Sequence, residues 1–386
     1  MRSVSPTWIR VFILTGFLSA VPMRAAAQEE KPVSPDALNQ GSALGEDSSR
    51  RLSITGFGVA TYTYDFRSDE NSFGDSALAV ALSKVISDHL SVFAQLTASR
   101  EPDSPFIGGE THHDIETDID NLQLTWLPSA RSGLAVTFGK FDSPLAIERD
   151  DAPLNFQATN SFTFDFARPV KFTGLQIHES FSEHFEGFAI LANGWDVDAD
   201  NNKGKTGAVY GLWSPTAASH FGLGVIYGPE KDDRTGDPRA TAVATALVQP
   251  SAAWVFGGEG VVGEEPHSAP DGGTARWYAG EVFTHHRFGE HWGTTLRLDY
   301  LDDRDGSRTG TAQILRSVTL SPQYLFGGGF FGIFRYLDRT SLRLPELSVR
   351  LDLRYDRSSE ATFRTREEGV GSRDHFAVTL QTVFLF

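Results

Sequence analysis

The chain has 386 residues, contains no cysteine and carries a formal net charge of −16. The lack of cysteine excludes a disulfide scaffold and a cysteine-ligated metal centre, and the strong negative charge disfavours nucleic acid as a partner. No run of 18 apolar residues follows residue 27, so the rest of the chain holds no segment typical of a transmembrane helix.

The N-terminal residues have the order of a secretory signal peptide. A basic start and the apolar stretch Val11–Val21 precede the small residues Ala25–Ala27. The apolar stretch is too short to span a bilayer, which takes about 20 residues. We therefore predict a cleaved signal peptide over 1–27, and a flexible periplasmic lead-in over 28–50, where the chain is polar and contains Pro and Gly.

From residue 51 to 386, apolar and polar residues alternate in segments separated by turn-forming clusters. In Ser87–Ser99, for example, leucine, valine and alanine alternate with serine, glutamine and threonine. Side chains of a strand point alternately to its two faces, so each segment has one lipid side and one water side. The pattern recurs about sixteen times, which predicts an all-β, transmembrane antiparallel β-barrel over 51–386. A barrel of that size holds water in its lumen.

The linkers between these segments are of two kinds. Short turns such as Pro215–Ser219 alternate with long, acidic, glycine-rich stretches. The long stretches are Glu101–Glu116, Gly228–Arg239, Gly263–Ala275 and Asp302–Gly310. Short turns at one end and long extracellular loops at the other are typical of outer-membrane barrels.

The stretch 142–169 is the best candidate for a functional loop. Four phenylalanines in it argue against simple solvent exposure. Mixed charges on a loop folded into the lumen would narrow the pore and select among solutes. We predict a constriction loop; an exposed extracellular loop and an unrecognised strand pair are the alternatives. Its candidate site residues are Glu148, Arg149, Asp150, Asp151, Asp165 and Arg168.

No motif along the chain indicates catalysis or a bound cofactor. The run Asp196–Asn202 resembles the start of a calcium loop, but Asn201 and Gly207 stand where that motif needs Gly and Glu. A solvated turn, or a loop that loosely binds divalent ions, is the interpretation we prefer. The histidine pairs lack the three or four converging ligands of a metal site, and no nucleophile elbow, phosphate loop or dinucleotide fingerprint is present. The sequence thus predicts no catalytic residue, no cofactor and no metal.

Charged residues alternate strictly with apolar ones in Leu347–Asp356. Inside a barrel the charged face lines the lumen, and opposite charges two residues apart can pair across the ladder. The same pattern places Arg297 and Asp299 on one polar face. The predicted pore-lining residues are Arg297, Asp299, Ser348, Arg350, Asp352, Arg354 and Asp356.

The last predicted strand, His375–Phe386, has one apolar face and ends on an aromatic residue. Bacterial outer-membrane barrels end in this way, and the ending resembles the signal that their insertion machinery reads. This strand makes a pore in the outer membrane the leading functional interpretation.

Three stretches resemble the OmpL-like β-barrel porins of Gram-negative bacteria, the β-barrel porin-2 family. They are Phe138–Glu148, Asn193–Thr206 with its Asn-Gly-Trp-Asp turn, and Arg354–Ser358 before the final strand. The resemblance implies a passive diffusion pore for small hydrophilic solutes or ions in the outer membrane, without enzyme activity or cofactor. It implies outer-membrane lipid and the barrel assembly machinery as partners, and it allows a homotrimer.

The sequence leaves the selectivity and two other functional classes open. Residues 142–169 hold five carboxylates against two arginines and no lysine, which predicts a weak preference for cations. An outer-membrane barrel hydrolase would need a Ser-His-acid set. Serine and histidine residues are available, but no motif in the sequence links them into such a set. A structural or adhesive barrel without a transport role is the second alternative.

Overall fold

The computed structural model describes residues 52–74, 76–100, 104–109, 114–129, 133–326 and 346–386. The predicted signal peptide and the lead-in, 1–50, lie outside these residues. Within them, the alternating segments form one antiparallel sheet of seventeen strands. The strands are β1 (Ser53–Asp65), β2 (Glu70–Phe73), β3 (Ala77–Ser87), β4 (Leu90–Ser99), β5 (Glu116–Trp126), β6 (Leu134–Asp142), β7 (Lys171–Ser182), β8 (Phe185–Ala192), β9 (Thr206–Thr216), β10 (Ser219–Lys231), β11 (Arg234–Ser251), β12 (Trp254–Glu265), β13 (Ala275–Phe288), β14 (Trp292–Asp303), β15 (Gln313–Phe326), β16 (Leu347–Ser358) and β17 (Asp374–Leu385).

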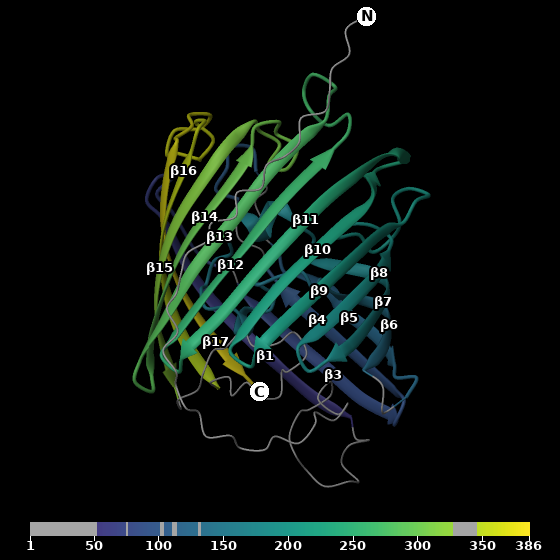
Figure 1. Ribbon diagram of the computed structural model, residues 1–386. Coiled ribbons are helices and arrows are strands. Elements are labelled where there is room, and N and C mark those ends of the chain that lie inside the picture. Colours follow the sequence, from purple (N-terminus) through teal and green to yellow (C-terminus); the bar gives the residue numbers. More distant parts are fainter. Residues whose placement is uncertain (1–51, 75, 101–103, 110–113, 130–132, 327–345) are drawn as a thin grey trace, which may run out of the picture. The chain divides into compact units, whose positions relative to one another are not determined.

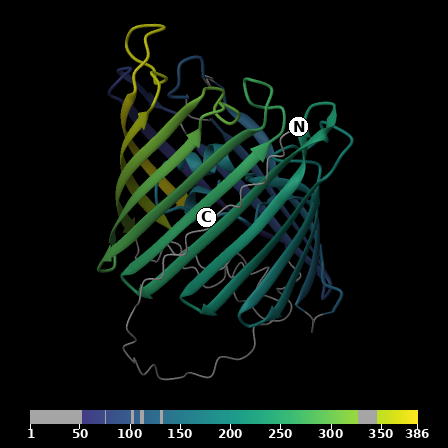
Figure 2. The ribbon, with the colours of Figure 1, turned by 45° about the horizontal axis from the view of Figure 1, so that its top comes forward.

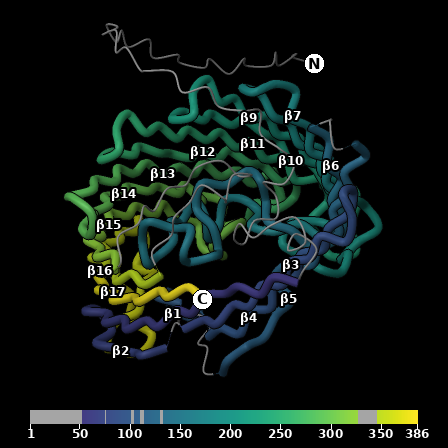
Figure 3. The backbone as a smooth tube through the Cα atoms, turned by 90° about the horizontal axis from the view of Figure 1, so that it is seen from below, coloured from purple at the N-terminus to yellow at the C-terminus, as the bar shows by residue number. Residues whose placement is uncertain are grey.

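The sheet closes into a barrel because its first and last strands pair. The register of β1 with β17 runs from Phe57↔Leu385 to Asp65↔Ala377. Sixteen strands run round the barrel (Figures 1 and 3). The short β2 is an extra strand that pairs with the last residues of β1, while β3 pairs with its first half. The prediction of an antiparallel barrel of about sixteen strands is confirmed.

The two ends of the barrel differ in their connections. We call the end that carries Phe386 the near end and the opposite end the far end. At the near end, residues 88–89, 183–184, 217–218 and 252–253 form tight turns. At the far end, longer segments join the strands, among them 143–170, 193–205 and 359–373.

The prediction of a long loop over Gly228–Arg239 is wrong. Strands β10 and β11 continue through it and turn at residues 232–233, where Asp233 takes a φ of 56°. Lys231 and Arg234 are ladder partners beside this turn. Its polar, acidic composition suits an extended hairpin as well as a loop.

The side chains of the barrel are arranged inside out relative to a soluble protein. Large apolar residues such as Phe138, Leu223 and Val225 are exposed on the outer face, whereas Thr295, Arg297 and Asp352 are buried inside. This distribution suits a barrel whose outer face meets lipid. In the described part of the chain, no helix combines the length and the apolar character needed to cross a bilayer.

We expect arginine to be costly on the outer face and tolerated on the inner face of the same strand. Leu380 is exposed outside the barrel, and its neighbour Thr379 lines the interior cavity. Leu380→Arg should destabilise the folded barrel in lipid vesicles by about 2–4 kcal/mol, because it places a charge in the bilayer core. Thr379→Arg should cost much less. Urea unfolding followed by tryptophan fluorescence measures both, and equal losses would contradict this assignment of faces.

Candidate pore and its inserted segment

The segment between β6 and β7, residues 143–170, folds into the barrel. We call it the inserted segment; Figures 2 and 3 show it in blue-teal inside the ring of strands. It contains a 3-10 helix, η2 (Ala152–Leu154), and a π-helical turn, η3 (Thr163–Ala167). Apolar burial explains its course, because Leu145 and Phe162 join one buried cluster with wall residues while Ile147 and Phe156 join another.

The first polar anchor of this segment is an ion pair with β14. Nη1 of Arg297 lies 2.5 Å from Oε1 of Glu148, and both side chains are almost fully buried. Arg297 also donates to the carbonyls of Thr159 and Asn160, at 2.6 and 2.9 Å. The other Glu148 oxygen accepts from the amide and hydroxyl of Ser161, at 2.8 and 2.6 Å. One pair of charges thus fixes two separate parts of the segment to the wall.

The second anchor is on β16. Oδ2 of Asp352 accepts hydrogen bonds from the amides of Ala158 and Thr159, at 3.0 and 2.9 Å, and from the Thr159 hydroxyl at 2.8 Å. Nη1 of Arg350 donates to the carbonyls of Ala152 and Gln157, at 3.0 and 3.1 Å. These side chains satisfy backbone groups that would otherwise be buried without partners.

Two further contacts complete the attachment to the wall. Nε of Arg168 lies 2.5 Å from Oε1 of Glu259 on β12, and Oε2 of Glu259 accepts from the amide of Ile147 at 2.9 Å. On β16, Arg354 donates to the Asn160 carbonyl at 2.6 Å and lies over the ring of Phe162. The segment is therefore held along β12 to β16.

The opposite edge of the segment meets β4, β5 and the start of β7. Nζ of Lys171 contacts Asp150, and it lies 2.9 Å from both Asp120 and Asp142. Nε2 of Gln95 donates to Asp151 at 2.7 Å. Carboxylates outnumber cations at this edge.

An open cavity of about 1440 Å³ remains between the inserted segment and the wall formed by β1 to β5 and β16 to β17. Three arginines line it: Arg100, Arg354 and Arg364. Ten carboxylates line it: Asp65, Asp69, Glu70, Glu116, Asp118, Asp120, Asp150, Asp151, Asp165 and Asp356. We call this space the pore cavity.

The structure places the predicted site residues in three groups. Five of them lie on the barrel wall and contact the inserted segment: Arg297, Asp299, Arg350, Asp352 and Arg354. Two of them, Glu148 and Arg168, belong to the inserted segment and contact the wall. Asp150, Asp151, Asp165 and Asp356 line the pore cavity. The other two lie apart: Ser348 is buried inside the barrel, and Arg149 bonds within the segment, to the Ser143 carbonyl.

Several residues of the site were missed from the sequence. Glu116, Asp118 and Asp120 form an acidic row on β5, and their spacing of two residues was a readable signal. Glu259 is isolated among glycines in β12, and no local pattern marks it.

The acidic run Asp196–Asn202 lies in a far-end loop. Its carboxylates contact lysines, since Asp198 lies 3.1 Å from Lys140 and Asp200 pairs with Lys205. In the residues that the structure describes, no three His, Asp or Glu side chains are grouped so that they could hold a metal ion.

Comparisons with known proteins agree with this architecture. The model of the family described as "Putative beta-barrel porin-2, OmpL-like" matches residues 63–386. A search of curated proteins gave no significant match. Among solved structures, an anion-selective porin from Comamonas acidovorans is similar at 10% identity and a TM-score of 0.58, over 87% of this chain and 99% of that one.

Two further solved barrels are similar in fold. Salmonella typhi OmpF, in a complex with daunomycin, is 11% identical with a TM-score of 0.58, over 88% of this chain and 99% of that one. A loop-deletion mutant of OmpT, an outer-membrane protein of Vibrio cholerae, is 11% identical with a TM-score of 0.56, over 87% and 99%.

Proposed function

Because the chain belongs to the OmpL-like β-barrel porin-2 family and has the fold of solved porins, we propose that solutes cross it through the pore cavity and that the pore prefers cations. The inserted segment is the constriction in this proposal, since it occupies part of the barrel interior and leaves the cavity beside it. The solutes would be small and hydrophilic, because the cavity is lined mostly by polar side chains.

The excess of carboxylates along the pore cavity carries the proposal. Ten carboxylates face three arginines there. Lys140 and Lys171 also reach the acidic edge, where they pair with Asp118 and Asp120. Counting both lysines, and also Arg366, which lies 3.1 Å from Asp69, leaves four carboxylates in excess, and clusters of carboxylate favour cations in a narrow pore. Because part of the charge is paired, we expect a weak preference.

Reversal potentials of single channels in planar bilayers, measured across a potassium chloride gradient, test the selectivity. We expect potassium to be favoured over chloride, and more so at 0.1 M than at 1 M salt, because the screening length falls from about 10 Å to about 3 Å. Asp150→Asn with Asp151→Asn should reduce the preference, and Glu116→Gln with Asp118→Asn should reduce it further. Asp271→Asn, at an exposed position outside the pore cavity, is the matched control.

Two outcomes would count against this proposal. A reversal potential that favours chloride would reject cation preference for the whole pore. An unchanged potential in the Asp150 and Asp151 double variant, with a cation preference in the parent protein, would reject the inserted segment as its source.

We also propose that the protein is a homotrimer without enzymatic activity. One solved form of Vibrio cholerae OmpT is described as a trimer, which supports this assembly for a related barrel. Light scattering of the detergent-solubilised protein, corrected for bound detergent, should give three times the chain mass. Hydrolysis of ester or peptide substrates by the refolded protein would revive the alternative of a barrel hydrolase.

A further inference from the structure

Two arginines face each other on the outer surface of the barrel near its far end. Arg316 of β15 and Arg357 of β16 are direct ladder partners, and both side chains are exposed. Like charges directly opposite each other across a ladder are destabilising. The pair therefore favours an anion that would lie between or above the two guanidinium groups.

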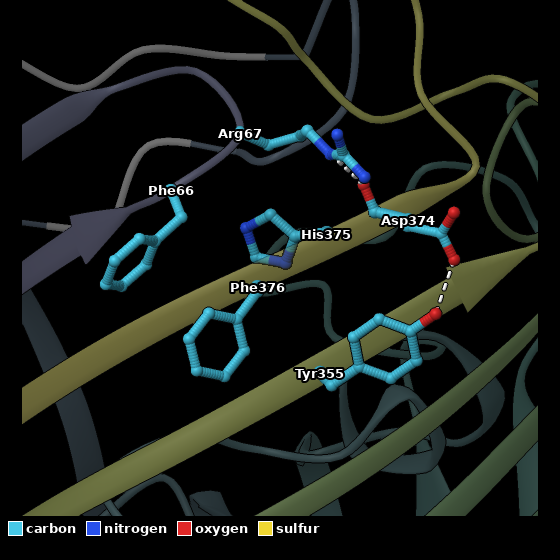
Figure 4. Close-up of a pocket in the computed structure, with 6 residues that line it drawn as sticks. All are labelled: Phe66, Arg67, Tyr355, Asp374, His375 and Phe376. Carbon is cyan, nitrogen blue, oxygen red and sulfur yellow. Dashed lines mark hydrogen bonds between the residues drawn. The ribbon is translucent and has the colours of Figure 1, made fainter.

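A third arginine and a single aspartate complete this row. The next ladder partner of Arg357 is Asp374 of β17, whose carboxylate lies 3.4 Å from the Arg357 guanidinium. Nε of Arg67, in the turn after β1, donates to the backbone carbonyl of Asp374 at 3.2 Å (Figure 4). We call Arg67, Arg316, Arg357 and Asp374 the rim row.

The rim row carries excess positive charge on a strongly acidic chain. Neither Arg67 nor Arg316 has an ion-pair partner in the part of the chain that the structure describes. The ring of Tyr300 lies under Arg316, 5.9 Å from its guanidinium carbon. The adjacent carboxylate on the β14 side, Asp302, is paired with Arg304 at 2.5 Å. Three arginines against one aspartate leave two charges uncompensated.

An aromatic groove of about 240 Å³ adjoins the rim row. Phe66, Tyr355 and Phe376 line it, and each is exposed on the outer face of the barrel. The rings of Phe66 and Phe376 lie 5.1 Å apart, and the Tyr355 hydroxyl donates to Asp374 (Figure 4). The groove continues the lipid-facing surface, so cationic groups and an apolar floor meet at one place.

We propose that the rim row and this groove bind a phosphorylated glycolipid of the outer leaflet, with a phosphate on the arginines and an acyl chain on the aromatic rings. Arginine suits phosphate because its planar guanidinium offers paired donors. The leaflet follows from the fold, since most of the longer connections are at the far end, and long connections are extracellular in outer-membrane barrels. The site lies outside the pore and is independent of the proposed ion selectivity.

Native mass spectrometry of the detergent-solubilised protein, titrated with diphosphoryl lipid A, tests this site. Arg316→Gln with Arg357→Gln should weaken binding about thirtyfold, since each arginine at a membrane surface contributes a factor of about five. Arg276→Gln is the matched control, because Arg276 is also exposed and its charge is already paired with Glu264. The affinity of this control variant for diphosphoryl lipid A should stay within a factor of about two of the parent value.

Two other lipids, a folding assay and a second variant make the result decisive. Monophosphoryl lipid A should bind more weakly than the diphosphoryl form. Phosphatidylglycerol should bind more weakly than lipid A; equal binding would overturn the assignment to a glycolipid. Equal affinities of the double variant and the parent protein would overturn the site itself. Heat-modifiable mobility in gels verifies the fold of each variant, and Arg67→Gln provides a second test if the double variant does not fold.

Discussion

Arg297→Met is expected to loosen the inserted segment and raise the single-channel conductance. The Arg297 guanidinium holds the Glu148 carboxylate at 2.5 Å and two segment carbonyls at 2.6 and 2.9 Å. Removing it leaves the carboxylate of Glu148 buried against the wall without its cation. Breaking one side of a buried ion pair costs about 3–5 kcal/mol, which is enough to shift the segment between attached and released states. Planar-bilayer recordings should show larger and noisier open-channel currents.

A double-mutant cycle separates the ion pair from the general effect of changing a buried side chain. Glu148→Gln removes the charge but keeps one side-chain oxygen that can accept the hydrogen bonds from Ser161. In the double variant, Arg297→Met should cost less than in the parent protein, because the carboxylate of Glu148 is then absent and only that of Asp299, 3.4 Å from Arg297, loses this cation. Arg276→Gln, on the outer face, should leave the conductance unchanged. Additive effects of the two pore substitutions would contradict a direct coupling between Glu148 and Arg297.

The alternation of residues predicted the barrel and the orientation of its strands because that pattern is local. In β16, the period of two placed Arg350 and Asp352 on the face opposite to Leu351, and the structure has them inside. Four phenylalanines within 142–169 also indicated burial for that segment, and Phe156 and Phe162 are indeed buried. Hydrophobic burial and side-chain alternation can be recognised in a short window of sequence.

The contacts that position the inserted segment could not be predicted in this way. Glu148 and Arg297 are 149 residues apart, and several inward arginines have the same local pattern. Which of them meets Glu148 depends on the path of the segment through the barrel. The prediction of a long loop between β10 and β11 failed for a related reason, because extended polar hairpins and polar loops have similar compositions. The extra strand β2 has only four residues, too few for a periodic pattern.

Gly58→Leu is expected to weaken the closure of the barrel. Gly58 of β1 is the ladder partner of Phe384 in β17, and a Cβ at Gly58 would lie 2.1 Å from the Phe384 ring. The glycine thus allows the aromatic ring to lie across the closing pair of strands, an arrangement known to support glycine in sheets. Overpacking of this kind costs about 1–3 kcal/mol, and here it acts where the two ends of the sheet must meet.

Urea unfolding in lipid vesicles and the amount of folded protein in outer membranes measure this effect. Ala60→Leu is the matched control, because Ala60 lies two residues further along β1 and is exposed on the same outer face. Phe384→Ala combined with Gly58→Leu should recover part of the lost stability, since the added side chain then occupies the space of the ring. Deleting Phe386 should also lower the folded amount, because its backbone exchanges hydrogen bonds of 2.9 and 3.0 Å with Gly56. If Gly58→Leu and Ala60→Leu behave alike, the ring of Phe384 contributes nothing specific to closure.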